Sequence, residues 1–110
     1  MNWVHKIFGK KLYSEITVSE LCVLSDDVRR IDVREPDEFG GELGHLRGAE
    51  LVPLKALTDI ARSWDCGTPF LIVCRSGARS AQACQILTDM GFENVTNLKG
   101  GMLAVRAAGL

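Results

Sequence analysis

The segment LIVCRSGARS, residues 71–80, decides the fold that we expect for this chain. Its first residues belong to a short, nearly all-apolar run, residues 69–74, which is typical of a central strand covered on both faces. Its last residue opens a second pattern, residues 80–90, in which apolar side chains recur at the spacing of one helix face. A strand, a short loop and a helix in immediate succession form the unit from which α/β domains are built.

The remainder of the chain repeats this alternation of strand-like and helix-like segments. We expect further strands at residues 15–16, 28–33, 49–52 and 95–98, and further helices at 17–24, 37–39, 54–63 and 102–108. Thr17 followed by Glu20 forms a capping box, and Pro36 suits the first turn of a short helix. Residues 40–48 carry four glycines and indicate a loop. The alternation therefore predicts an α/β domain whose sheet has helices on both faces.

Length and composition indicate one globular domain. The 110 residues suffice for one domain with its own core, and 46% apolar and 25% charged residues are ordinary values. A formal net charge of -1 favours neither nucleic acid nor an acidic membrane as a partner. No apolar run approaches the roughly 20 residues that span a bilayer. The first residues, MNWVHKIFGKK, lack the apolar core of a signal peptide, so we expect a cytoplasmic protein; an amphipathic surface anchor is the alternative.

The cysteines and histidines form no metal-binding pattern. No cysteine belongs to a C-x-x-C pair, and neither histidine stands at metal-ligand spacing from the cysteines; the residues concerned are Cys22, Cys66, Cys74, Cys84, His5 and His45. We therefore expect free thiols, no metal and no other cofactor. Cys22 and Cys84 fall in predicted helices, where inert packing is the expectation.

Cys74 stands where the chemistry of an α/β domain is concentrated, at the carboxyl end of the most apolar strand. The loop after it can turn successive backbone N–H groups toward the sulfur, because Gly77 and the small Ala78 permit close approach of the backbone. The following helix directs its positive end to the same point, and Arg75 and Arg79 add permanent positive charge. Each feature favours a thiolate over a thiol, so we expect a nucleophile that is reactive at neutral pH inside an anion-binding cradle.

The sequence contains three further motifs besides the loop at residues 74–80: IDVREPDEF at residues 31–39, GHLRGA at 44–49 and LKGGM at 98–102. Together they resemble the rhodanese family of sulfurtransferases, in the order and approximate spacing of that family, from about residue 16 to residue 110. The resemblance implies a rhodanese-like three-layer domain, with a central, mostly parallel sheet flanked by helices on both faces. We expect this domain at residues 15–110, after an N-terminal extension at residues 1–14.

The resemblance also implies a reaction. In the rhodanese family the loop cysteine, here Cys74, takes a sulfane sulfur from a donor such as thiosulfate and passes it, as a persulfide, to cyanide or a thiol. The donor is a small anion that Arg75 and Arg79 would attract, and a protein can also be the sulfur acceptor. The backbone amides that would hold the outer sulfur belong to Arg75, Ser76, Gly77, Ala78, Arg79 and Ser80.

Two residues of the IDVREPDEF motif, Asp32 and Arg34, match family positions near the cysteine loop, and we expect them to orient that loop as an ion pair; exposed charges are the alternative. His45 is read as a turn or packing residue, because a preformed thiolate requires no general base. Cys66, beside Gly67 in a predicted loop, is expected to be exposed. A second hypothesis for Cys66 is that it resolves the persulfide as a disulfide.

Three other functions stay open at this point. A sulfur-relay module would receive persulfide sulfur from one protein and deliver it to another through the same loop. A cysteine phosphatase or arsenate reductase of the same fold is disfavoured, because those enzymes use a longer loop than the four residues between Cys74 and Arg79. A catalytically silent binding domain of this fold is disfavoured as well, since such domains usually lack the cysteine.

Overall fold

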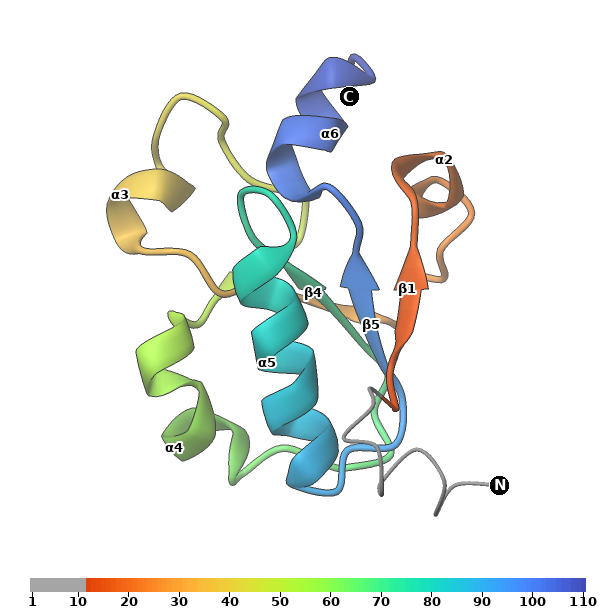
Figure 1. The fold of residues 1–110 in the computed structure, drawn as a ribbon, viewed down its shortest axis with the longest axis vertical. Helices are drawn as coiled ribbons and strands as arrows, with labels where there is room; N and C mark the ends of the chain where they lie inside the picture. The colour runs from red at the N-terminus through yellow and green to blue at the C-terminus, as the bar shows by residue number, and fades with distance from the viewer. Residues whose placement is uncertain (1–11) are drawn as a thin grey trace.

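The computed structural model describes residues 12–110, and within them it contains one sheet of five strands, each pair of neighbours parallel (Figure 1). The order across the sheet is β1-β5-β4-β2-β3, which places β4 at the centre. The strands are β1 Ser14–Ile16, β2 Arg29–Asp32, β3 Glu50–Leu51, β4 Phe70–Val73 and β5 Val95–Leu98. The all-parallel order brings the carboxyl ends of all five strands to one edge, where loops and helix starts meet.

Helices cover both faces of this sheet. They are α2 Val18–Leu21, α3 Pro36–Phe39, the 3-10 turn η1 Leu54–Ala56, α4 Leu57–Ala61, α5 Ala78–Asp89 and α6 Gly101–Ala107. One apolar cluster joins the sheet to α4 and α5, and a second joins it to α2 and α6. The predicted three-layer α/β architecture is therefore confirmed, with α4 and α5 in one outer layer and α2 and α6 in the other.

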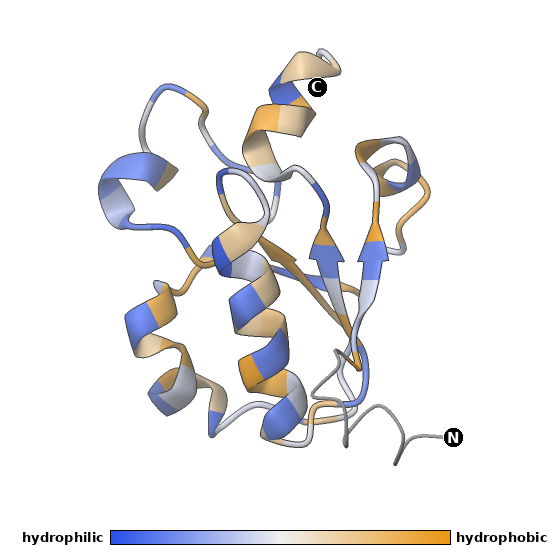
Figure 2. Cartoon of the chain, viewed as in Figure 1, coloured by the Kyte–Doolittle hydropathy of each residue, from blue (hydrophilic) through white to orange (hydrophobic). Residues whose placement is uncertain are grey.

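The central strand β4 supplies side chains to both clusters, as its apolar sequence predicts (Figure 2). Phe70, Ile72 and Cys74 belong to the cluster beneath α4 and α5. Leu71 and Val73 belong to the cluster beneath α2 and α6. Because successive side chains of a strand point to opposite faces, the Cys74 thiol, which follows β4, lies on the α5 side of the sheet.

Three helices differ from their predicted bounds for identifiable local reasons. The capping box at Thr17 is present, since the Thr17 N–H donates to the Glu20 carboxylate at 3.0 Å. Helix α2 ends at Leu21, because the N–H groups of Val23 and Leu24 donate to carbonyls three residues earlier and form turns instead of continuing the helix. The segment that we expect to be one helix from residue 54 begins with a 3-10 turn, in which the Ala56 N–H donates to the Pro53 carbonyl at a distance of 2.8 Å. The third difference, an early start of α5, belongs to the site described below.

The proposed N-terminal extension, residues 1–14, lies mainly outside the described residues, as does the alternative of a surface anchor there. Within residues 12–110, no helix combines the length and the apolar character that a membrane crossing demands.

Candidate active site around Cys74

Cys74 lies at the carboxyl end of β4 and faces the first turn of α5. Its Sγ accepts a hydrogen bond from the Gly77 N–H at 3.1 Å, and the residue is only 1% exposed. The N–H groups in the first turn of a helix have no carbonyl partner within that helix, and the helix dipole makes this end positive. The sulfur therefore has one backbone donor, the Gly77 N–H, and faces the positive end of α5, and both favour an anion.

The connection from strand to helix is shorter than the sequence pattern suggests. Helix α5 begins at Ala78, two residues before its expected start, and Gly77 at its N-cap has a φ of 102°. This left-handed conformation is unstrained for glycine, and a Cβ at this position would lie 3.2 Å from the Gly100 nitrogen. The amides of Ala78, Arg79 and Ser80 therefore belong to the first helical turn, whereas Arg75 and Ser76 form an exposed loop.

The start of α6 supports this loop from the opposite side. The Met102 N–H donates to the Cys74 carbonyl at 2.9 Å, and the Leu103 N–H donates to the Arg75 carbonyl at 3.0 Å. Gly101 permits this approach, because a Cβ there would overlap the Cys74 carbonyl oxygen and lie 2.6 Å from that of Arg75. The glycines of the LKGGM segment thus allow the start of α6 to support the backbone of Cys74 and Arg75.

The buried side chains of Ser80 and Asn97 connect the sulfur to the exposed Glu15 at the edge of the sheet. The Ser80 Oγ lies 3.3 Å from the Cys74 Sγ and donates to the Asn97 Oδ1 at 2.5 Å. The Asn97 Nδ2 in turn donates to the Glu15 carboxylate at 3.1 Å. Asn97 and Glu15 were missed by sequence reasoning. The available signal for Asn97 was an asparagine on a predicted strand, next to the apolar Leu98.

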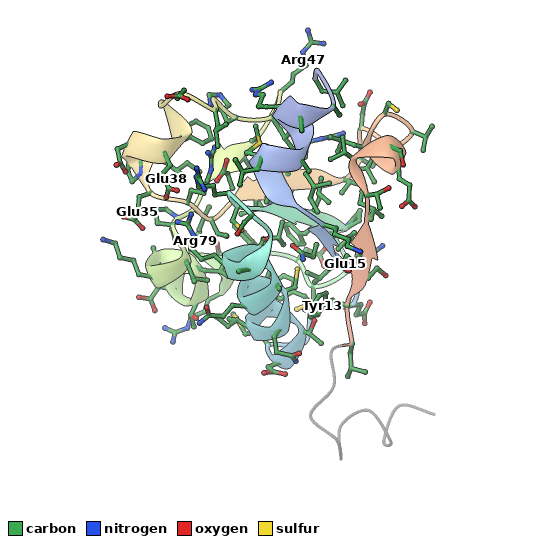
Figure 3. The ribbon with its side chains drawn as sticks, turned by 45° about the horizontal axis from the view of Figure 1, so that its top comes forward. Tyr13, Glu15, Glu35, Glu38, Arg47 and Arg79 are labelled. Atoms are coloured by element: carbon green, nitrogen blue, oxygen red, sulfur yellow. The ribbon has the colours of Figure 1, made fainter. Side chains whose placement is uncertain are left out.

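Arg79 does not stand free beside the sulfur. Its guanidinium binds both oxygens of the Glu38 carboxylate at 2.7 and 2.8 Å, and Figure 3 shows the two side chains meeting between α3 and α5. The hydrogen bonds from Arg79 lower the pKa of Glu38 from 4.5 to about 2, and the same bonds raise the pKa of Arg79. The charge of Arg79 is therefore largely compensated, unlike the free cation that the sequence led us to expect.

Asp32 and Arg34 form a buried ion pair, so the alternative of exposed charges is wrong. The Arg34 Nη2 and Nε donate to the Asp32 carboxylate at 2.8 and 2.9 Å, and both side chains are at most 1% exposed. The Arg34 Nη2 also donates to the Gly44 carbonyl at 2.6 Å. The pair thus anchors the loop of residues 40–48, and it reaches the cysteine loop only indirectly.

A cavity of about 310 Å³ adjoins the cysteine loop, and its lining is richer in carboxylates than in cations. Arg75 borders it, and among residues 12–110 no ion pair involves that side chain. The other lining residues are Arg34, Asp37, Glu38, Gly41, Glu42, Leu43 and Leu103. An incoming ligand therefore meets one uncompensated guanidinium and several carboxylates at this entrance.

The remaining candidate residues lie outside this centre. His45 stacks on Phe39 with ring centroids 3.7 Å apart, which agrees with a packing role. Cys84 is buried in the core, as expected, whereas Cys22 is exposed because α2 ends before it, so the packing prediction for Cys22 is wrong. Within residues 12–110, no three potential metal-ligating side chains gather in one place.

Cys66 is exposed, as predicted, but it lies before the amino end of β4, while Cys74 lies beyond the carboxyl end. The four residues of β4 alone separate them by about 13 Å at the usual rise of a strand. A disulfide needs Cα atoms within about 7 Å of each other. The hypothesis that Cys66 resolves a persulfide on Cys74 of the same chain is therefore wrong.

Comparisons with known proteins agree with this arrangement. The sequence model of the protein family described as "Rhodanese-like domain" matches residues 17–108 of this chain. A sulfurtransferase of Allochromatium vinosum is 34% identical to this chain over 99 residues, which cover 86% of each of the two chains. The thiosulfate sulfurtransferase GlpE of Pseudoalteromonas translucida is 30% identical over 98 residues, which cover 87% of this chain and 91% of that protein. A crystal structure of a rhodanese-like domain protein from Staphylococcus aureus, 32% identical, matches with a TM-score of 0.74 over 84% of this chain and 90% of that one. This chain belongs to the family of rhodanese-like domains.

Proposed function

We propose that this protein is a sulfurtransferase that moves a sulfane sulfur from a donor such as thiosulfate to a thiophilic acceptor through a persulfide on Cys74. The observation that carries the proposal is the position of the Cys74 Sγ, which accepts the Gly77 N–H at 3.1 Å and faces the positive end of α5. This setting favours the thiolate, which is the form of cysteine that attacks sulfur. The names of the relatives from Allochromatium and Pseudoalteromonas support the same reaction class.

The proposed reaction has two displacement steps. In the first, the Cys74 thiolate attacks the outer sulfur of thiosulfate, the sulfur–sulfur bond of the donor breaks, and sulfite leaves with the bonding electrons. In the second, cyanide or a thiolate attacks the outer sulfur of the persulfide, and Cys74 leaves as a thiolate. We expect the amides of residues 75–80 to hold the outer sulfur in between, and the Gly77 N–H, which donates to the Cys74 Sγ, supports this expectation.

A sulfur-relay module, in which the donor or acceptor is a thiol on another protein, is the second candidate. The observation in its favour is the compensation of Arg79 by Glu38, which leaves Arg75 to attract a dianion beside the carboxylates of Asp37 and Glu42. A persulfide or thiol carried by a protein needs less positive charge at the entrance. Low activity with free thiosulfate together with fast transfer from a protein persulfide would favour this candidate.

The phosphatase or arsenate reductase alternative receives little support. A tetrahedral oxyanion needs a wider ring of amides than one sulfur atom, and α5 begins only four residues after Cys74. Arg79, which such an enzyme would use to bind the oxyanion, is held by Glu38 instead. The cytoplasmic location, and the expectation that neither nucleic acid nor a membrane is a partner, stay predictions.

The decisive experiment is intact-mass measurement after treatment with thiosulfate. The parent protein should gain one sulfur atom, which cyanide then removes as thiocyanate, while Cys74→Ser should gain none. Cys66→Ser is the matched control, because that thiol is exposed and lies at the other end of the sheet. A parent protein that stays unmodified by both thiosulfate and a protein persulfide, or an adduct that survives in Cys74→Ser, would overturn the proposal.

A further inference from the structure

Four polar side chains from four segments form one hydrogen-bonded row, which is buried except at Glu15 and ends on the Cys74 sulfur. It runs from Cys74 after β4 through Ser80 on α5 and Asn97 on β5 to Glu15 on the edge strand β1. Ser80 is 0% exposed and Asn97 is 2% exposed, so water does not compete for their hydrogen bonds. Buried polar groups are costly unless they are paired, and here each is paired with the next.

The partners of Asn97 determine which way its amide points. Its Nδ2 lies 3.1 Å from the Glu15 carboxylate and 3.4 Å from the Gly77 carbonyl, and both of these groups only accept hydrogen bonds. The amide nitrogen must therefore face them, which leaves the Oδ1, a pure acceptor, facing Ser80 at 2.5 Å. The single hydroxyl hydrogen of Ser80 is consequently directed to Asn97.

This direction has a consequence for the sulfur. While the Ser80 hydrogen points to Asn97, the Ser80 oxygen turns lone pairs toward the Cys74 Sγ at 3.3 Å. Such an oxygen accepts a hydrogen bond from a thiol and repels a thiolate. The Gly77 N–H, 3.1 Å from the same sulfur, has the opposite preference. One hydrogen is thus available to three acceptors, the Asn97 oxygen at 2.5 Å, the Gly77 carbonyl at 3.2 Å and the Cys74 sulfur at 3.3 Å, and the nearest of them is Asn97.

We propose that Asn97, held by Glu15, is a positioning residue that competes with the Cys74 sulfur for the hydroxyl hydrogen of Ser80. In the resting thiol, the S–H donates to Ser80, and Ser80 donates to Asn97. When the sulfur is a thiolate, or carries the second sulfur atom of a persulfide, the hydroxyl rotates and donates to the sulfur, and its bond to Asn97 is lost. This inference rests on the proposed function of Cys74 and extends it to the control of its ionisation.

Other charged groups also act on this sulfur from the elements around it. Arg79 on α5 is paired with Glu38 on α3, the Asp32–Arg34 pair follows β2, and Arg75 is in the loop itself. The first turn of α6, Gly101 to Leu103, carries no charge. A neutral substitution of Asn97 leaves all of these charges in place, so its effect on Cys74 reports the hydrogen-bond competition.

The test is the rate of Cys74 alkylation by iodoacetamide as a function of pH, in a background where the exposed Cys22 and Cys66 are serine. Asn97→Leu keeps the number and branching of the side-chain heavy atoms and removes the competing acceptor. The pH midpoint should fall by about half to one unit, the effect of one neutral hydrogen bond. Thr96→Val, on the same strand, is the control and should leave the midpoint unchanged.

A second pair of variants separates competition from a general structural effect. In Ser80→Ala, where no hydrogen is shared, adding Asn97→Leu should leave the midpoint unchanged, whereas Ser80→Thr keeps the hydroxyl and should restore the response. A midpoint that rises, or stays fixed, in the single variant Asn97→Leu overturns the inference, and so does an equal shift in the Ser80→Ala background. If Asn97→Leu does not fold, Asn97→Ala carries the same expectation.

These outcomes are distinguishable from failure of the proposed function. Sulfur loading of the parent protein, read by intact mass, tests the persulfide, and the shift between variants tests the competition. A parent protein that loads sulfur with no shift in Asn97→Leu retains the function and refutes the role of Asn97.

Discussion

Arg79 and Glu38, 41 positions apart in the chain, form an ion pair with two hydrogen bonds of 2.7 and 2.8 Å. The pair joins the first turn of α5, which faces the Cys74 sulfur, to the short helix α3. It fixes the position of α3 against the site, and it compensates one of the two arginines that would otherwise attract an anionic donor. Both consequences are open to measurement.

Removal of the Glu38 charge should improve the reaction with thiosulfate. Glu38→Gln frees the Arg79 guanidinium and removes a carboxylate from the entrance, so kcat/KM for thiosulfate should rise by about fivefold at low ionic strength. The gain should shrink as salt is added, because salt screens charges near the surface. Asp59→Asn, which removes a carboxylate on the remote helix α4, is the matched control. A lower kcat/KM in Glu38→Gln would show that the pair is required for the reaction, and an unchanged value would show that compensation of Arg79 does not limit it; either result contradicts the prediction.

The same pair should make the stability of the fold depend on pH in the acid range. The pKa of Glu38 is lowered from 4.5 to about 2 by Arg79, so the folded state holds a proton on this group less readily than the unfolded state. The stabilisation is therefore complete above the unfolded pKa and is lost as the pH falls through the folded value. Since both side chains are partly exposed, we expect about 1 kcal/mol.

Urea denaturation across this pH range, for the parent and for Glu38→Gln, provides the measurement. The parent should be more stable by about 1 kcal/mol near neutral pH, and the difference should vanish toward about pH 2. A difference between the two proteins that stays constant with pH would contradict the assignment to Glu38.

Gly101 should tolerate no side chain. Gly101→Ala places a Cβ against the carbonyl oxygens of Cys74 and Arg75 at a φ of +57°, so we expect a loss of more than about 3 kcal/mol of unfolding free energy and loss of persulfide formation. Gly48→Ala is matched to it, since Gly48 also has a positive φ, +75°, but its Cβ would meet nothing within 4 Å. That control should lose only about 1–2 kcal/mol and keep its activity. Equal losses in the two variants would mean that the contact with the cysteine loop is unimportant.

The buried pair of Asp32 and Arg34 should be among the most sensitive positions for stability. Arg34→Leu leaves the Asp32 carboxylate buried without its cation and should cost about 3–5 kcal/mol in unfolding free energy. Adding Asp32→Asn should recover part of this loss, because the unpaired charge is removed. Arg62→Leu, which breaks an exposed pair with Asp59, should change stability by no more than about 0.5 kcal/mol. Thermal or urea unfolding of the four proteins gives the comparison.

Sequence reasoning succeeded where neighbouring residues decide the outcome. The apolar run before Cys74 indicated the central strand, and β4 is that strand, with side chains in both clusters. The pairing of Asp32 with Arg34 was predicted from their match to positions of the rhodanese family, and the pair itself is local, since only one residue separates the two. In both cases the information is local, because strand alternation and short-range ion pairs depend on residues close together in the chain.

Sequence reasoning failed where a distant segment decides the outcome. Arg79 was expected to be a free cation, but Glu38 reaches it from α3. Asn97 and Glu15 were not suspected at all, because strand order β1-β5-β4 is what brings them into line with Ser80. The early start of α5 was missed as well, since the left-handed conformation of Gly77 is set by the packing of this loop against Gly100.

The sequence by itself determined the α/β class, the place of Cys74 at the end of a buried strand and the glycine-containing turn into a helix, because these follow from periodicity and from the conformational range of each residue. Only the tertiary structure decided what surrounds the sulfur: a compensated Arg79, a carboxylate-bordered entrance and a serine hydrogen directed to Asn97. Such electrostatic details depend on distances between segments, and those distances exist only once the parallel sheet has brought the strand ends together.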